Sequence, residues 1–71
     1  MTKLNEETYS KEVKSAEKTL SFVKMLGNMM GENSTTSQKT EYKKTLSNAT
    51  TFLEDRKREL SLVIQHNKLV A

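Results

Sequence analysis

The chain has 71 residues, with no cysteine, no proline, two glycines and a single histidine. A chain of this length forms at most one small domain, and one hydrophobic core is marginal at this size. The lack of cysteine excludes disulfides and thiolate metal sites. Twelve lysines and arginines against nine acids give a net charge of +3, well below the concentrated positive charge of typical nucleic-acid-binding domains.

No segment approaches the roughly 18 to 20 apolar residues that a membrane crossing needs. The first residues, 1–14, are charged throughout and lack the apolar middle region of a signal peptide. The sequence therefore predicts a soluble protein that stays in the cytoplasm.

The first predicted helix covers about residues 6–30, where apolar residues recur at alternating steps of four and three. This period places them on one stripe of an amphipathic helix. Asn5 is the expected N-cap, and Gly31 is expected to end the helix in a left-handed conformation. The apolar stripe is called the seam of this helix, and Gly27 falls in a skipped seam position. The seam contains Tyr9, Val13, Ala16, Leu20 and Val23.

A polar loop is predicted over residues 31–37, followed by a second helix over about 38–67. Thr35 and Gln38 match a capping box, in which each side chain binds the backbone N–H of the other. Ser37 is an equally good candidate for the cap, so two starting points of the helix stay open. The second helix carries a seam with the same spacing, which continues past Arg56. Its defining residues are Tyr42, Leu46, Ala49 and Leu53.

Two amphipathic helices joined by one short loop become antiparallel neighbours. The predicted fold is therefore an all-α antiparallel two-helix hairpin that forms one domain over residues 1–71. Apolar residues outside the seams exceed what two helices can bury, and each large buried side chain is worth roughly 1.5–3 kcal/mol. We therefore expect self-association or a partner protein to complete the hairpin. The predicted partner-binding residues are Phe22, Met25, Met29, Leu60, Leu62, Val63 and Ile64.

The residues needed for catalysis are scarce. Nucleophilic catalysis needs a serine, threonine or cysteine held against a histidine, and the only histidine is His66, near the C-terminus. No histidine lies four residues away and no cysteine is present, so a metal site within one chain is poorly supported. We expect His66 to act as a structural cation at the end of the second helix. The sequence predicts a non-enzymatic protein without metal or cofactor.

An alternative hypothesis is a small dimeric hairpin regulator, of phage or plasmid type, that binds RNA or DNA. Lysines line an outer face of the first helix, and arginines cluster on the second. Such residues contact phosphates without reading sequence, but here acidic residues interleave with them. The residues assigned to this alternative are Lys11, Lys14, Lys18, Arg56 and Arg58.

Four short segments occur in an order shared with a known family. The chain opens with Met1-Thr-Lys-Leu4, places Glu41-Tyr42-Lys43 early in the second helix, and continues with Leu53-Glu54 and an aliphatic cluster from Leu60 to Ile64. In this layout the chain resembles the small helical-hairpin co-chaperones of the type III secretion needle protein.

The resemblance implies a bacterial cytoplasmic protein that binds a helical-repeat chaperone and, together with it, keeps the needle subunit soluble by preventing early polymerisation. It also implies that four residues contribute to a packed or partner-facing surface. These residues are Tyr42, Leu53, Leu60 and Val63.

Overall fold

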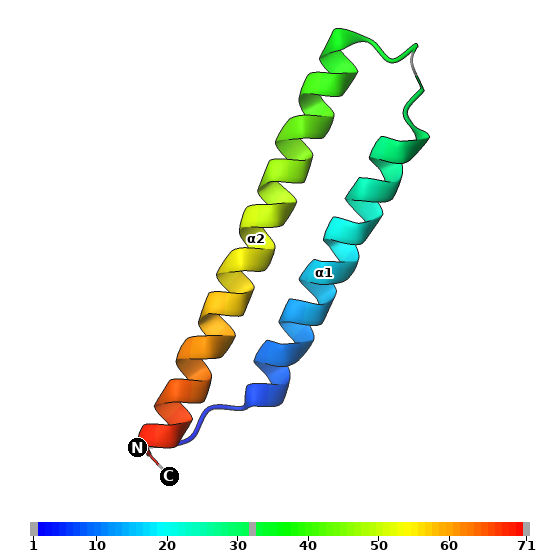
Figure 1. The fold of residues 1–71 in the computed structure, drawn as a ribbon. Helices are drawn as coiled ribbons and strands as arrows, with labels where there is room; N and C mark the ends of the chain where they lie inside the picture. Colours follow the sequence, from blue (N-terminus) through cyan, green and yellow to red (C-terminus); the bar gives the residue numbers. More distant parts are fainter. Residues whose placement is uncertain (1, 32, 71) are drawn as a thin grey trace.

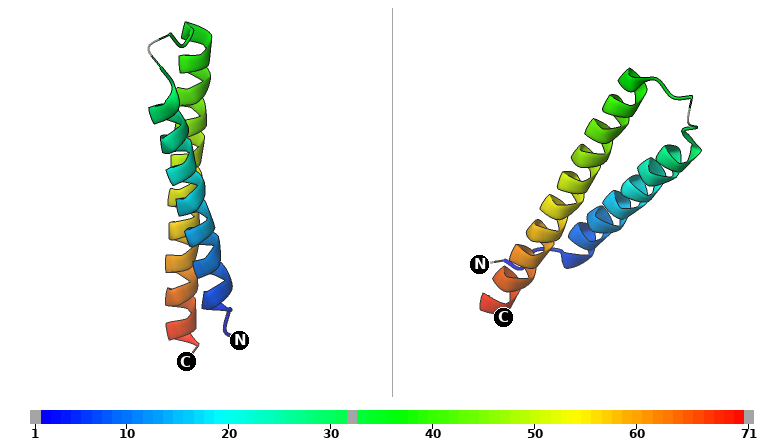
Figure 2. Two further views of the ribbon diagram at one scale, coloured as in Figure 1. Left: turned by 90° about the vertical axis from the view of Figure 1, so that its right-hand side faces the viewer. Right: turned by 45° about the horizontal axis from the view of Figure 1, so that its top comes forward.

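The computed structural model describes residues 2–31 and 33–70, which contain two helices, α1 (Glu6–Met29) and α2 (Thr36–Leu69). The helices run side by side in opposite directions, with the N-terminal segment beside the last turn of α2 (Figure 1). Their Cα atoms span 56 × 15 × 11 Å, and two further views show the same narrow two-helix rod (Figure 2). The predicted all-α antiparallel hairpin is confirmed.

Helix α1 begins where the sequence places its cap. The Asn5 side chain accepts hydrogen bonds from the backbone N–H groups of Glu7, at 3.0 Å, and Thr8, at 3.4 Å. These bonds satisfy N–H groups that have no partner within the helix. The predicted cap is therefore confirmed.

The end of α1 differs from the prediction. Met30 leaves the helix through extended backbone, with φ −70° and ψ 118°, while its N–H still donates to the carbonyls of Leu26 and Gly27. Among the described residues no glycine has a positive φ, so the expected left-handed stop at Gly31 is wrong. The helix ends because Met30 becomes extended, one residue before the glycine.

Helix α2 begins at a complete capping box. The Thr35 Oγ1 accepts from the Gln38 N–H at 3.1 Å, and the Gln38 Oε1 accepts from the Thr35 N–H at 2.9 Å. Of the two candidate caps, Thr35 is the one used, and Ser37 lies inside the first turn. The helix spans 34 residues, against 24 for α1. It runs from Thr36 to Leu69 and therefore extends beyond the predicted 38–67 at both ends.

The core is a single line of small and medium side chains between the helices. Val13, Ala16 and Leu53 form its centre, and Leu20 and Leu60 pack against them. Ala16 is only 1% exposed, so its small side chain sits where the two helices come close. With so thin a core, contacts at the two ends of the hairpin matter for stability.

Asn67 joins the two ends of the chain. It is buried, 6% exposed, and its Oδ1 accepts from the Leu4 N–H at 2.8 Å. Its Nδ2 donates to the Leu4 carbonyl at 2.9 Å and to the Glu6 carboxylate at 3.0 Å. The His66 Nε2 lies 3.2 Å from the Thr2 carbonyl oxygen. These bonds hold residues 2–5 beside the last turns of α2, which extend past the start of α1.

Replacing the buried amide should therefore destabilise the hairpin. We expect Asn67→Ala to lower the free energy of unfolding by about 1–3 kcal/mol, because the Leu4 backbone loses its partners. Gln65→Ala, at an exposed position on the same helix, is the matched control and should change stability little. Urea unfolding and hydrogen exchange at the Leu4 amide measure both effects. Equal stability of the two variants would contradict this role of Asn67.

Candidate protein-binding surface

The C-terminal half of α1 exposes a row of large apolar side chains. Phe22 is 55% exposed and Met29 is 74% exposed, and Met25 and Leu26 lie between them, also exposed. Spacings of three and four residues put these four on one side of a helix that turns about 100° per residue. They are called the outer stripe. Apolar rows of this kind on a small protein indicate a contact surface.

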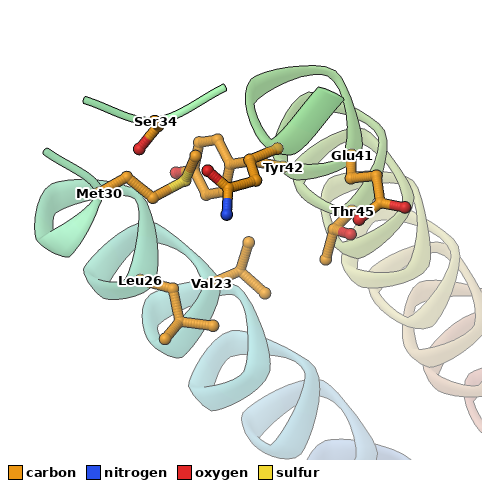
Figure 3. A pocket seen from close by; sticks show the side chains of 8 residues that line it. Val23, Leu26, Met30, Ser34, Glu41, Tyr42 and Thr45 are labelled. Atoms are coloured by element: carbon orange, nitrogen blue, oxygen red, sulfur yellow. The ribbon is translucent and has the colours of Figure 1, made fainter. Parts of the chain in front are cut away.

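A groove lies beside the outer stripe, where the two helices approach the loop. It has a volume of about 320 Å³. Apolar side chains from α1 and the aromatic ring of Tyr42 form its interior, and polar side chains form its edge (Figure 3). It is called the first groove. Its lining residues are Val23, Leu26, Met30, Ser34, Gln38, Glu41, Tyr42 and Thr45.

The outer stripe and the first groove form one continuous surface, because Leu26 belongs to both. This combined area is called the loop-end surface. It has an apolar centre and a rim of serine, glutamine and glutamate side chains, as protein interfaces do. The arrangement can hold apolar side chains of another molecule.

Tyr42 determines the shape of this end of the hairpin. Its ring reaches from α2 to α1 and lies against the backbone of Gly27, beside the Met30 side chain (Figure 3). A Cβ atom built on Gly27 would overlap the ring, lying 2.7 Å from its Cε2 atom. The glycine in the seam of α1 therefore provides the space for the tyrosine of the opposite seam. The ring fills the gap at the centre and leaves a groove open on each side of it.

This packing predicts that the effect of Gly27→Ala on stability changes sign when the Tyr42 ring is removed. We expect Gly27→Ala to destabilise the wild-type chain by up to about 2 kcal/mol, because the methyl group displaces the ring. In a Tyr42→Ala background the same change should stabilise the chain by up to about 1 kcal/mol, the helix-propensity gain of alanine over glycine.

Thermal and urea unfolding of the four chains measure the coupling between the two positions. Asn28→Ala, at the exposed neighbouring position, should have the same effect in both backgrounds. The same sign for Gly27→Ala in both backgrounds would contradict the proposed packing.

Most of the predicted partner-binding residues are accessible, but the group does not form one surface. Phe22, Met25, Met29 and Leu62 are exposed. Leu60 and Ile64 are half-buried, and Leu60 packs on the core.

Val63 requires a correction, because it is only 5% exposed and belongs to the interior of the hairpin. It lies three residues after Leu60, which packs on the core, and so falls on the same side of α2. A residue in this position cannot touch a partner while the hairpin is closed.

The predicted seam residues all lie between the helices, at two levels of burial. Four are buried, and the remaining five are half-buried. The buried residues are Val13, Ala16, Val23 and Leu53, and the half-buried ones are Tyr9, Leu20, Tyr42, Leu46 and Ala49.

Four exposed apolar residues lie outside the predicted partner-binding set: Leu4, Leu26, Phe52 and Leu69. Leu26 could have been found, because it lies four residues after Phe22 and three before Met29. Phe52 follows the seam by a single position, and Leu69 is 85% exposed on the last turn of α2. The exposure of Phe52 and Leu69 depends on which flank of α2 is covered by α1, and the spacing of apolar residues alone does not reveal this.

Three of the five basic residues considered for nucleic-acid binding lie beside carboxylates of the chain, whereas Lys14 and Lys18 are exposed. Lys11 lies 3.5 Å from the Glu7 carboxylate. Arg56 lies 2.7 Å from the Glu59 carboxylate and stacks over the Phe52 ring at 4.8 Å from its centroid. Arg58 and Asp55 are 3.6 Å apart. Both arginines thus face carboxylates of their own helix, which weakens their attraction for phosphates.

Within residues 2–31 and 33–70, histidine, aspartate and glutamate do not gather in groups of three or more that could bind a metal ion. Neither described helix is apolar over a sufficient length to cross a bilayer. Comparisons with protein-family models, with curated proteins and with solved structures found no match to this chain.

Proposed function

We propose that this chain is a non-enzymatic protein-interaction module whose loop-end surface binds another protein. The observation that carries the proposal is the outer stripe, where Phe22 and Met29 are more than half exposed beside an apolar groove. Covering these side chains would contribute roughly 1.5–3 kcal/mol for each one fully buried. A domain with so thin a core gains more from such a contact than a large domain does.

The partner that we propose is a helical-repeat chaperone, and the pair would keep a needle-type subunit of type III secretion soluble in the bacterial cytoplasm. The proposal rests on the resemblance in sequence layout, and it is supported by the hairpin fold and by the methionines of the outer stripe. Methionine side chains adapt to the shape of a partner because they are flexible and polarizable. A concave helical-repeat surface suits a narrow rod of two helices.

Charge introduced into the outer stripe should abolish the association. We expect Phe22→Asp and Met29→Asp to prevent complex formation while the helix content stays near that of the parent, because both side chains point to solvent in the free hairpin. Size-exclusion chromatography with light scattering, on the chain alone and after co-expression with the products of neighbouring genes, measures association. Circular dichroism measures helix content.

Ser21→Asp is the matched control, since it adds the same charge beside the stripe at an exposed polar position. Leu62→Asp tests whether the other end of the hairpin also takes part in the contact. Complexes that survive both Phe22→Asp and Met29→Asp would show that the contact surface is wrongly assigned. A chain that stays a stable monomer with every neighbouring product would argue against a binding function.

The alternative function predicts a different result. A nucleic-acid-binding hairpin would retard RNA or DNA in a gel-shift assay at low salt, with affinity falling steeply as salt increases. We expect no retardation, because the net charge is small and both arginines lie beside carboxylates. Retardation that disappears in Lys14→Gln and Lys18→Gln variants would favour the alternative.

A further inference from the structure

A second groove lies on the other flank of Tyr42 and shares only Met30 and Tyr42 with the first groove. It has a volume of about 390 Å³. Met30, Leu46 and the Tyr42 ring provide its apolar interior, and the two glycines leave its α1 side open. Its lining residues are Gly27, Met30, Gly31, Lys39, Tyr42, Lys43 and Leu46.

The two grooves differ in charge. Lys39 and Lys43 line the second groove, one helical turn apart on α2, and none of its lining residues within 2–31 and 33–70 is acidic. Glu41 instead lines the first groove, on the opposite flank of the same helix. Within the described part of the chain, neither lysine forms an ion pair with a carboxylate. The second groove is therefore an apolar depression with a cationic edge.

We infer that the second groove binds an acidic amphipathic helix of a partner protein. An apolar side chain of that helix enters the depression beside Leu46, and two carboxylates one turn apart meet Lys39 and Lys43. The inference rests on the proposed interaction function. It adds a second contact site, whose edge carries two lysines where the first groove carries Glu41.

A helix fits this groove best because side chains on one face of a helix recur at the same spacing as the two lysines. Carboxylates at positions i and i+4 of a helix are spaced like the two lysines, which are also at i and i+4. An apolar side chain at i+3 or i+7 then points to the same side. A phosphate backbone would meet the lysines but would leave the apolar interior uncovered. Complementary charge at an interface selects the partner and its orientation.

The test uses the full chain and a synthetic helical peptide of about four turns. The peptide carries leucines on one face, flanked by two glutamates one turn apart, and a control peptide has glutamine in place of both glutamates. Titration is followed by the backbone amide signals of the ¹⁵N-labelled chain. We expect the acidic peptide to shift the amides around Lys39, Lys43 and Leu46, and to bind about tenfold more tightly than the glutamine peptide.

The double variant Lys39→Gln/Lys43→Gln should remove this preference. Lys14→Gln/Lys18→Gln, an exposed pair of lysines one turn apart on α1, is the matched control and should keep it. Equal binding of the two peptides, no binding of the acidic peptide, or equal losses in both double variants would overturn the inference. Identical amide shifts with an RNA duplex, or with phosphatidylserine-containing vesicles, would assign the groove to phosphate groups and would also overturn it.

The Phe22→Asp variant separates the two proposals. It alters the outer stripe and leaves the lining of the second groove unchanged, so it should still bind the acidic peptide. If the lysine variants bind the peptide normally while Phe22→Asp loses its protein partner, the inference fails and the proposed function stands. If Phe22→Asp keeps its protein partner but the lysine variants lose the peptide, the contact at the loop-end surface fails instead.

Discussion

Two helices can contact each other along only one line, and this limit shapes the whole molecule. The seams of the two helices face each other, and Ala16 is the most buried of their side chains. A hairpin has no third element to cover a second apolar side of either helix. The side chains of the outer stripe therefore remain in solvent, although they are as apolar as those in the core. The same limit leaves this small chain with a thin core and with apolar surface in solvent, which is why we propose a binding function.

The two ends of the hairpin supplement the thin core with different contacts. At the terminal end, the amide of Asn67 binds the backbone of Leu4 and so connects the beginning of the chain to its end. At the loop end, an aromatic ring rests on a glycine, and the space that remains on its two flanks forms two grooves. Hydrogen bonds connect the first end, although Leu62 and Leu69 are exposed there, whereas both grooves lie at the second end. We propose binding at the loop end because the grooves are there.

The local elements of the fold were predictable because their signals are local. Seam spacing at steps of three and four predicts both helices, and the side chains of Asn5 and Thr35 predict their first turns. The end of α1 was not predictable, since glycine permits a left-handed stop without requiring one. Here Met30 is extended instead.

The candidate site was only partly predictable, because it depends on how the two helices lie against each other. The exposure of Phe22 follows from the position of the seam on the same helix. The role of Asn67 depends on Leu4, which is 63 residues away in sequence. Tyr42 and Gly27 both appear in seam positions, but only the paired helices show that one provides the space for the other.

Methionine oxidation measures directly whether the hairpin leaves the outer stripe uncovered. The purified chain is treated with dilute hydrogen peroxide at several protein concentrations, and the oxidation rate of each methionine is measured by mass spectrometry. We expect Met25 and Met29 to oxidise much faster than Met30, which is half-buried, and we expect added partner to slow the first two. Equal and slow oxidation of all three at the lowest concentration would show that the chain covers this surface itself, and would contradict an exposed outer stripe.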